Sequence, residues 1–338
     1  MNRIGVALVG IGAGAVPHLR SLHDLRETVE LRHAVTRHPA AADMGPFNGI
    51  LAATSDLQSA LADPGVQAVI VATPPSTHLE IAQRCFLSGK HVLLEKPLDI
   101  SLARSQAIVD TARDAKRHLG VVLQFRFRPG AIALQDVLTS GSLGAVQAAS
   151  VRVPWWRPQS YYEHAGRGTI ARDGGGVLVT QAIHSIDLFR SLVGVTSVVA
   201  AQVRRTSLHS METEDFTSAM LTLGNGAPGY LMATTAMYPG LPESIEIIGT
   251  LGSAVLEGGT LRIHYIDGRT LHVASEGGTG SGANIMDFSH AAHCALLNDF
   301  AQAIALDRAP RVTGNEALAT QQLIEQVLLC AGSISVPH

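Results

Sequence analysis

Six residues near the start of the chain have the spacing of a phosphate-binding turn. They read Gly10-Ile11-Gly12-Ala13-Gly14-Ala15, which matches G-x-G-x-x-A. The first glycine permits a tight turn, the second lets the backbone approach a pyrophosphate, and the small last residue lets a helix pack closely on a strand. Alone, the pattern also fits an ordinary glycine turn. Because a strand-like run precedes it and a helical pattern follows, a dinucleotide site is favoured.

The end of the second expected strand, Thr36-Arg37-His38, contains no carboxylate. A NAD site usually has an acidic residue there, about twenty residues after the glycines, which holds the ribose hydroxyl. Arg37 can instead pair with a 2′-phosphate, and Thr36 can donate a hydrogen bond to it. We therefore expect NADP(H) as the preferred cofactor, with NAD(H) as the other possibility. The alternative is that Arg37 is an ordinary solvated surface residue.

Residues 69–98 place a lysine where a parallel sheet binds its ligands. They read as a strand, a Thr73-Pro74-Pro75 turn, a helix that contains His78, and a strand ending at Glu95-Lys96-Pro97. The carboxyl ends of such strands line the ligand crevice. Partial desolvation beside a cation lowers the pKa of a lysine and suits it to general acid–base chemistry. Composition alone would make Lys96 a surface residue.

The second half of the chain holds another group of polar and aromatic residues. Thr180, Gln181 and His184 follow a glycine run, and their spacing places them on one face of a helix. The preceding segment 155–162 is aromatic, and such rings stack on sugars or anchor a loop or an oligomer contact. Arg157 can pair with a carboxylate or a phosphate. The candidate substrate-binding residues are Lys96, Arg126, Trp156, Arg157, Tyr161, Thr180, Gln181 and His184.

The elements around these motifs change character along the chain. Up to residue 125, short apolar strands alternate with amphipathic helices, which is typical of a parallel sheet with helical crossovers. After Gly144 one helix precedes a series of strand-like runs. We therefore predict an α/β Rossmann domain over residues 1–122, followed over 123–338 by an α+β domain with a large, mainly antiparallel open sheet. Strands are expected at 4–9, 31–36, 68–72, 91–94, 121–125, 197–205, 215–223, 230–236, 245–249, 254–256 and 261–265. Helices are expected at 14–25, 77–88, 101–118 (with a Ser101 cap), 178–193, 286–306 and 315–329.

Bulk composition excludes several classes of protein. With 338 residues, 46% of them hydrophobic, the chain is long and apolar enough for two globular domains. Its 25 Lys and Arg are dispersed among 28 acids, so no nucleic-acid partner is expected. No apolar run is long enough to span a bilayer, no secretory signal begins the chain, and three distant cysteines form no disulfide pattern, so we expect a cytoplasmic location. His290 and His293 have metal-compatible spacing, but nothing completes the site, so no metal is predicted.

These motifs together resemble the Gfo/Idh/MocA family, named for glucose-fructose oxidoreductase and inositol dehydrogenase. The resemblance covers nearly the whole chain, through the glycine motif with His18, the Glu95-Lys96-Pro97 turn and the segment 174–187. It implies that Lys96 transfers the substrate proton and that His184 is a second catalytic or substrate-orienting group. Many members carry aspartate where this chain has Thr180. The candidate cofactor-binding residues are Gly10, Ile11, Gly12, Ala13, Gly14, Ala15, Thr36, Arg37, Thr73, Pro74, His78, Glu95 and Lys96.

The expected activity is reversible hydride transfer between NADP(H) and a carbonyl or hydroxyl carbon of a sugar, sugar derivative or small polyol. The Thr180-Gln181 pair resembles the branch of the family that contains nucleotide-sugar dehydrogenases. Two alternatives stay open: a nucleotide-binding regulator without turnover, and a glycosidase that retains its NAD. Because family members commonly assemble, we expect a homodimer or homotetramer formed through the sheet of the second domain.

Overall fold

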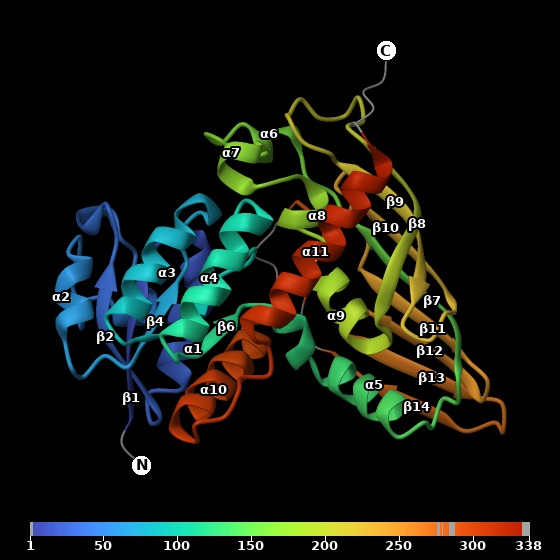
Figure 1. Cartoon of the computed structure of the whole chain (residues 1–338), viewed down its shortest axis with the longest axis horizontal. Helices are drawn as coiled ribbons and strands as arrows, with labels where there is room; N and C mark the ends of the chain where they lie inside the picture. The colour runs from blue at the N-terminus through green and yellow to red at the C-terminus, as the bar shows by residue number, and fades with distance from the viewer. Residues whose placement is uncertain (1–2, 276–277, 279, 284–287, 333–338) are drawn as a thin grey trace. The chain divides into compact units, whose positions relative to one another are not determined.

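The computed structural model describes residues 3–275, 278, 280–283 and 288–332, and it divides into two compact units (Figure 1). Unit 1 comprises residues 1–122 and 290–318, and unit 2 comprises residues 123–289 and 319–338. The units differ from the predicted domains in the segment 290–318, which the prediction assigned to the second domain. The segment belongs to unit 1 because its helix packs on a helix of the first 122 residues.

Unit 1 is built on a six-stranded sheet in which all paired strands are parallel. Its order is β3-β2-β1-β4-β5-β6, so the direction of the crossovers reverses between β1 and β4. Every residue of β1 and β4 is buried, as expected for a parallel sheet covered on both faces. The strands are β1 (Ile4–Val9), β2 (Val29–Val35), β3 (Ala53–Thr54), β4 (Ala68–Val71), β5 (His91–Leu94) and β6 (Leu119–Val121).

Helices cover both faces of this sheet. Right-handed crossovers that leave the sheet centre in opposite directions place their helices on opposite faces. Accordingly, α1 packs with α10, and α3 packs with α4. The helices are α1 (Val16–Asp24), α2 (Leu57–Ala62), α3 (His78–Leu87), α4 (Leu102–Asp114), α10 (Ala291–Ala305) and the start of α11 (Gly314–Ala331). Short 3₁₀ turns are η1 (Ala13–Ala15), η2 (Pro39–Ala41), η3 (Gly45–Phe47) and η4 (Pro75–Thr77). The Ser101 cap is confirmed, since its hydroxyl accepts a hydrogen bond from the Arg104 amide.

Unit 2 contains an eight-stranded sheet of order β14-β13-β12-β11-β7-β10-β9-β8. Its pairs are antiparallel except for β7 and β10, which run parallel. Figure 1 shows α5 (Pro129–Thr139) and α9 (Ile183–Val193) lying along one face of it. On β11, Ile245 and Ile247 are buried whereas Glu246 and Ile248 are exposed, so one face forms the core. The strands are β7 (Val146–Pro154), β8 (Val195–Arg204), β9 (Phe216–Leu223), β10 (Pro228–Thr234), β11 (Ser244–Gly249), β12 (Gly252–Glu257), β13 (Thr260–Tyr265) and β14 (Thr270–Val273).

The predicted fold class is confirmed, with local differences. The strand expected at 121–125 is wrong: β6 ends at Val121, and residues 124–127 form the 3₁₀ helix η5 (Gln124–Phe127). The helix expected at 178–193 is two helices, α8 (Val177–Thr180) and α9, because the Ala182 amide bonds back five residues and interrupts the helical ladder. Met286, the expected start of the next helix, lies outside the described residues.

Several elements carried no clear sequence signal. They are short or lie between stronger patterns, and comprise β3, β7, β14, α2, α5, α6 (Gln159–Tyr162) and α7 (Ile170–Asp173). None of the helices described is both long and apolar enough to cross a membrane.

Candidate cofactor and substrate sites

The register of the unit 1 sheet brings the predicted cofactor motifs to one edge. Val9 pairs with Val35 on one side and with Val71 on the other, and Val71 pairs with Leu94. The residues that leave these four strands at their carboxyl ends therefore follow a single row. In order across the sheet they are Thr36, Gly10, Ala72 and Glu95. This edge includes the point where the crossover direction reverses, which is where such sheets bind nucleotides.

The glycine turn has the shape that a pyrophosphate requires. Gly10 has φ +95°, and a Cβ there would lie 2.7 Å from the carbonyl group of Ala72. Gly12 and Gly14 are exposed, and a Cβ on either would meet no heavy atom within 4 Å. Ala15 is fully buried against the sheet. The turn is therefore open on its outer side, where backbone amides can approach a phosphate.

The end of β2 presents a cationic side chain. The Thr36 amide donates to the Thr54 carbonyl over 2.8 Å, which joins the end of β2 to β3. Arg37 is exposed, and among the described residues its guanidinium has no hydrogen-bond or ion-pair partner. It is therefore available to an anion bound at this edge.

His78 supports the edge from inside. Its ring is fully buried, with Nε2 2.9 Å from the Thr73 carbonyl oxygen and Nδ1 3.1 Å from the carbonyl oxygens of both Pro97 and Leu98. Burial lowers the pKa of His78. The prediction that His78 contacts the cofactor is therefore corrected: the imidazole joins the Thr73-Pro74 turn to the segment after Lys96, and has no exposed surface.

Glu95 and His18 form a pair beside Lys96. His18 Nε2 lies 2.8 Å from Glu95 Oε1, and Glu95 Oε2 accepts from the Lys96 amide over 3.2 Å. Burial raises the pKa of Glu95, but the hydrogen bond and charge of His18 outweigh it, so this pKa lies below its ordinary value. The ring of His293 contacts His18 edge-on at 5.8 Å. Glu95 is thus an ionised anchor for the backbone that carries Lys96, which is partly exposed.

In unit 2 the structure brings together Tyr161, Thr180 and Gln181. The side-chain nitrogen Nε2 of Gln181 lies 3.4 Å from the Tyr161 hydroxyl, and the Thr180 hydroxyl contacts the Gln181 side-chain oxygen. Arg167, which the sequence did not single out, donates to the same Tyr161 hydroxyl over 2.6 Å. His184 lies on α9 and stacks on Phe125 at 5.1 Å. Because the helix is interrupted after Thr180, these residues do not share one continuous helical face.

Two predicted substrate-binding arginines are corrected. Arg157 is 3% exposed, and its guanidinium donates to four carbonyl oxygens, those of Trp156, Gly280, Ser281 and Gly282. Arg126 is 8% exposed, and its Nε and Nη2 each lie 2.6 Å from the Asp187 carboxylate. Both side chains have buried partners within unit 2. They stabilise the fold and are not free to pair with a substrate anion.

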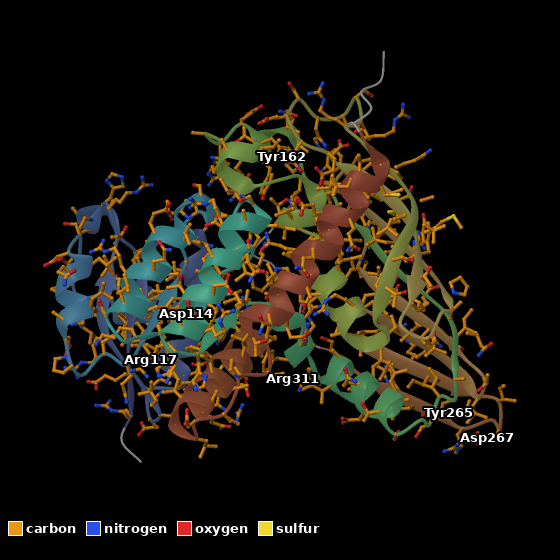
Figure 2. The ribbon with its side chains drawn as sticks, in the orientation of Figure 1. Asp114, Arg117, Tyr162, Tyr265, Asp267 and Arg311 are labelled. Atoms are coloured by element: carbon orange, nitrogen blue, oxygen red, sulfur yellow. The ribbon has the colours of Figure 1, made fainter. Side chains whose placement is uncertain are left out.

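The aromatic segment has two partly exposed members, Trp156 and Tyr161, and two buried members. Trp156 is partly exposed and meets Tyr238 edge-on at 5.5 Å, whereas Trp155 is buried. Tyr162, labelled in Figure 2, is buried on α6 with its hydroxyl 2.8 Å from Thr235 Oγ1. Trp156 and Tyr161 are therefore the members of this segment that can meet a ligand.

The histidines with metal-compatible spacing have other contacts. His290 Nε2 lies 2.7 Å from Asp24 Oδ2, and His293 packs on His18. Within the described part of the chain, no cluster of three or more His, Cys, Asp or Glu side chains could hold a metal ion.

Comparison with known proteins identifies the family. Residues 4–123 match the family described as "Oxidoreductase family, NAD-binding Rossmann fold", and residues 131–255 match the "GFO/IDH/MocA C-terminal domain". The chain is 30% identical over 282 residues to scyllo-inositol 2-dehydrogenase (NAD(+)) of Bacillus subtilis, covering 80% of this chain and 76% of that protein. The chain belongs to the Gfo/Idh/MocA family. The predicted enzyme class, a nicotinamide-dependent dehydrogenase or reductase, is thereby confirmed.

Two further relatives illustrate the range of the Gfo/Idh/MocA family. Levoglucosan dehydrogenase of Pseudarthrobacter phenanthrenivorans is 29% identical over 64% of this chain and 61% of its own length. The WlbA dehydrogenase of Bordetella pertussis, solved in complex with NADH and UDP-GlcNAcA, is 26% identical with a TM-score of 0.82, covering 100% of both chains. This Gfo/Idh/MocA protein is therefore an oxidoreductase with an NAD-binding Rossmann fold.

Proposed function

We propose that this protein is an NADP(H)-preferring oxidoreductase that transfers hydride to or from a carbonyl or hydroxyl carbon of a sugar, sugar derivative or small polyol. The observation that carries the proposal is the row at the carboxyl edge of the unit 1 sheet, which joins the open glycine turn to the Glu95-Lys96 turn. Relatives named for inositol, levoglucosan and a nucleotide sugar support the substrate class.

Lys96 is the proposed general acid and base. The chain has three lysines. The Lys90 ammonium is buried and donates to the carbonyl oxygens of Asp63 and Val66 over 2.9 and 2.7 Å, and Lys116 is exposed after α4. Lys96 alone follows a strand of the binding edge. The nicotinamide supplies the hydride chemistry, and Lys96 gives or takes the hydroxyl proton.

The preference for NADP(H) rests on Arg37. It is exposed at the end of β2, where Thr36, Arg37 and His38 contain no carboxylate to hold a ribose hydroxyl. Fluorescence titration should show that Arg37→Ala weakens NADPH binding by about 10- to 100-fold, the value of a charge-assisted hydrogen bond. NADH binding should change little, and Arg26→Ala, at an exposed arginine paired with Glu27, should affect neither. Equal losses for both nucleotides would remove Arg37 from the 2′-phosphate role.

The residues of unit 2 that we assign to substrate are Trp156, Tyr161, Thr180 and Gln181, with His184 as a second catalytic or orienting group. The aromatic rings offer stacking surfaces, and the hydroxyl and amide groups offer hydrogen bonds to sugar hydroxyls. This division agrees with the general pattern in which the cofactor performs the chemistry and the protein orients the substrate.

We also propose that the protein assembles as a homodimer or homotetramer through the second sheet. Met220 and Tyr230 are register partners on β9 and β10, and with Ile248 of β11 they leave 59%, 42% and 56% of their surfaces exposed. Exposed apolar residues on a sheet commonly mark an interface. A mass measured by light scattering that equals one chain at every concentration would contradict this assembly.

The test of the activity is the nicotinamide absorbance of purified protein with NADP(H) or NAD(H) and a panel of sugars, keto-sugars, polyols and sugar acids. Lys96→Ala should lower turnover by about 10²- to 10⁴-fold, as expected for loss of a general acid–base group. Lys116→Ala, at an exposed lysine, should leave it unchanged. Nucleotide binding without any turnover would favour a regulator, and hydrolysis of a glycoside with retained cofactor would favour the glycosidase alternative.

A further inference from the structure

One buried carboxylate holds the start of α8. Glu214 precedes β9 and is 2% exposed. Its Oε2 accepts from the Gly176 amide over 3.0 Å, its Oε1 accepts from the Leu178 amide over 3.2 Å, and its carbonyl oxygen accepts from the Val177 amide over 2.9 Å. The first amides of a helix have no partner inside the helix. A single residue from another element therefore serves three successive amides, while α8 has no side-chain cap of its own.

The contact leaves no room for a side chain at residue 176. A Cβ on Gly176 would lie 2.0 Å from the Glu214 carbonyl oxygen and 2.5 Å from its Oε2. The φ of Gly176 is −95°, outside the left-handed region, and the lack of space beside Glu214 excludes a side chain here. The last glycine of the run 174–176 is thus explained by its approach to Glu214.

Two of the residues assigned to substrate follow shortly after the amides that Glu214 binds. The Thr180 amide and hydroxyl both donate to the Gly176 carbonyl oxygen, over 3.0 and 2.7 Å. The backbone amide of Gln181 donates to the Val177 carbonyl oxygen over 3.2 Å. The places of Thr180 and Gln181 therefore follow directly from where Gly176 and Val177 are held.

The neighbouring carboxylate has a different task. Asp215 accepts from the amide and hydroxyl of Thr206 over 2.7 and 2.6 Å, and its Oδ2 lies 2.7 Å from His209 Nδ1. Its carboxylate oxygens are thus engaged away from α8. Only Glu214 of this acidic pair contacts the glycine run.

We propose that Glu214 is a positioning residue for substrate recognition: by binding the start of α8, its carboxylate sets the positions of Thr180 and Gln181. The proposal rests on the proposed function, because those two residues are assigned to substrate there. It goes beyond that function by assigning a role to Glu214, a buried residue that takes no part in the chemistry but sets the positions of two residues that bind substrate.

A matched pair of variants isolates this contact. In Glu214→Gln the side chain keeps its size, but one acceptor oxygen is replaced by an NH₂ group that faces an amide donor. Glu212→Gln is the control, since Glu212 is exposed and its Oε2 accepts from the Ile170 amide over 3.1 Å at the start of α7. Both variants thus weaken the cap of a short helix, and only α8 carries substrate residues.

The first readout is amide hydrogen exchange, which needs no substrate. At about pH 8, where Glu214 is ionised, Glu214→Gln should accelerate exchange in residues 176–178 about tenfold, the effect of losing one hydrogen bond to a charged group. Glu212→Gln should accelerate only residues 170–173. Unchanged exchange at 176–178 in Glu214→Gln would overturn the proposal. If that variant does not fold, Glu214→Asp, which keeps the charge but withdraws it by one methylene, is tested in the same way.

The second readout is a split between substrate and cofactor affinity. Glu214→Gln should raise the KM for the sugar or polyol about tenfold, while the Kd for NADPH and the KM of Glu212→Gln stay at the wild-type values. Faster exchange with an unchanged KM would overturn the positioning role. If the wild-type protein turns over no substrate, the proposed function fails, and the exchange experiment still decides separately whether Glu214 holds α8.

Discussion

The stability of the protein should fall as the pH rises through the pKa of Glu214. Burial raises this pKa from 4.5 to about 7, against the opposing hydrogen bonds from the amides of Leu178 and Gly176. The native state therefore binds this proton more tightly than the unfolded state does. Its contribution to the free energy of unfolding is fully present below about pH 4.5 and is lost as the pH rises through about 7.

The magnitude follows from the difference between the two pKa values. A difference of one in pKa corresponds to about 1.4 kcal/mol, so the change from 4.5 to about 7 is worth roughly 3 kcal/mol. Glu214→Gln carries no titrating group at this position. Other groups also make the stability depend on pH, such as Asp63, whose pKa lies at about 2, and His91, whose pKa lies at about 4. Their contributions are the same in both proteins, so they cancel when the free energy of unfolding of the variant is subtracted from that of the wild type.

The assay is urea unfolding of the wild type, Glu214→Gln and Glu212→Gln at intervals between about pH 5 and pH 8. Relative to the wild type, Glu214→Gln should gain about 2 to 3 kcal/mol across this range. The difference between the control and the wild type should stay constant across this range, because the Glu212 side chain is exposed. A flat difference for Glu214→Gln would refute the reasoning, since it would mean that the hydrogen bonds outweigh burial and keep Glu214 ionised throughout.

Two further changes test the supports of the sites. Gly10→Ala should cost about 1 to 3 kcal/mol in thermal unfolding and weaken NADPH binding, because the positive φ and the nearby carbonyl leave no place for a methyl group. Gly12→Ala, where no protein atom crowds the added methyl group, is its control for stability, and equal losses of unfolding free energy in the two variants would contradict the argument. Asp187→Ala should cost about 3 to 5 kcal/mol in urea unfolding, because it leaves the buried Arg126 without its carboxylate. Exposed Asp136→Ala should cost less than about 0.5 kcal/mol, and a similarly small loss for Asp187→Ala would show that the pair is not a stabilising element.

The cofactor edge could be predicted from the sequence because its signals are local. Continuous apolar runs such as 4–9 and 68–71 are typical of central strands of a covered sheet, and β1 and β4 are buried at every position. Turn motifs directly follow these runs, so their order along the chain already implies a shared edge. The end of the fifth expected strand was misplaced, because the apolar run 121–123 continues the strand pattern, although β6 ends at Val121 and residues 124–127 form a 3₁₀ helix.

Side-chain partners were decided by tertiary structure. The sequence around an arginine does not show whether the fold places a carboxylate or a set of carbonyl oxygens beside its guanidinium group. Arg126 pairs with Asp187, which lies 61 positions away in the sequence. Arg157 donates to the carbonyl oxygens of residues 280–282, which lie 123 to 125 positions away. Both were predicted to bind substrate, and both are buried by these contacts.

The sequence by itself therefore determined the family, the two kinds of sheet and the strand ends where cofactor chemistry is expected, because periodicity and turn geometry act over a few residues. Only the tertiary structure decided which polar side chains are exposed to a ligand and which are buried in contacts with other parts of the protein. Glu214 illustrates the difference: nothing near it in sequence points to Gly176, which lies 38 positions away. Their approach exists only once β9 and the start of α8 have been brought together by packing.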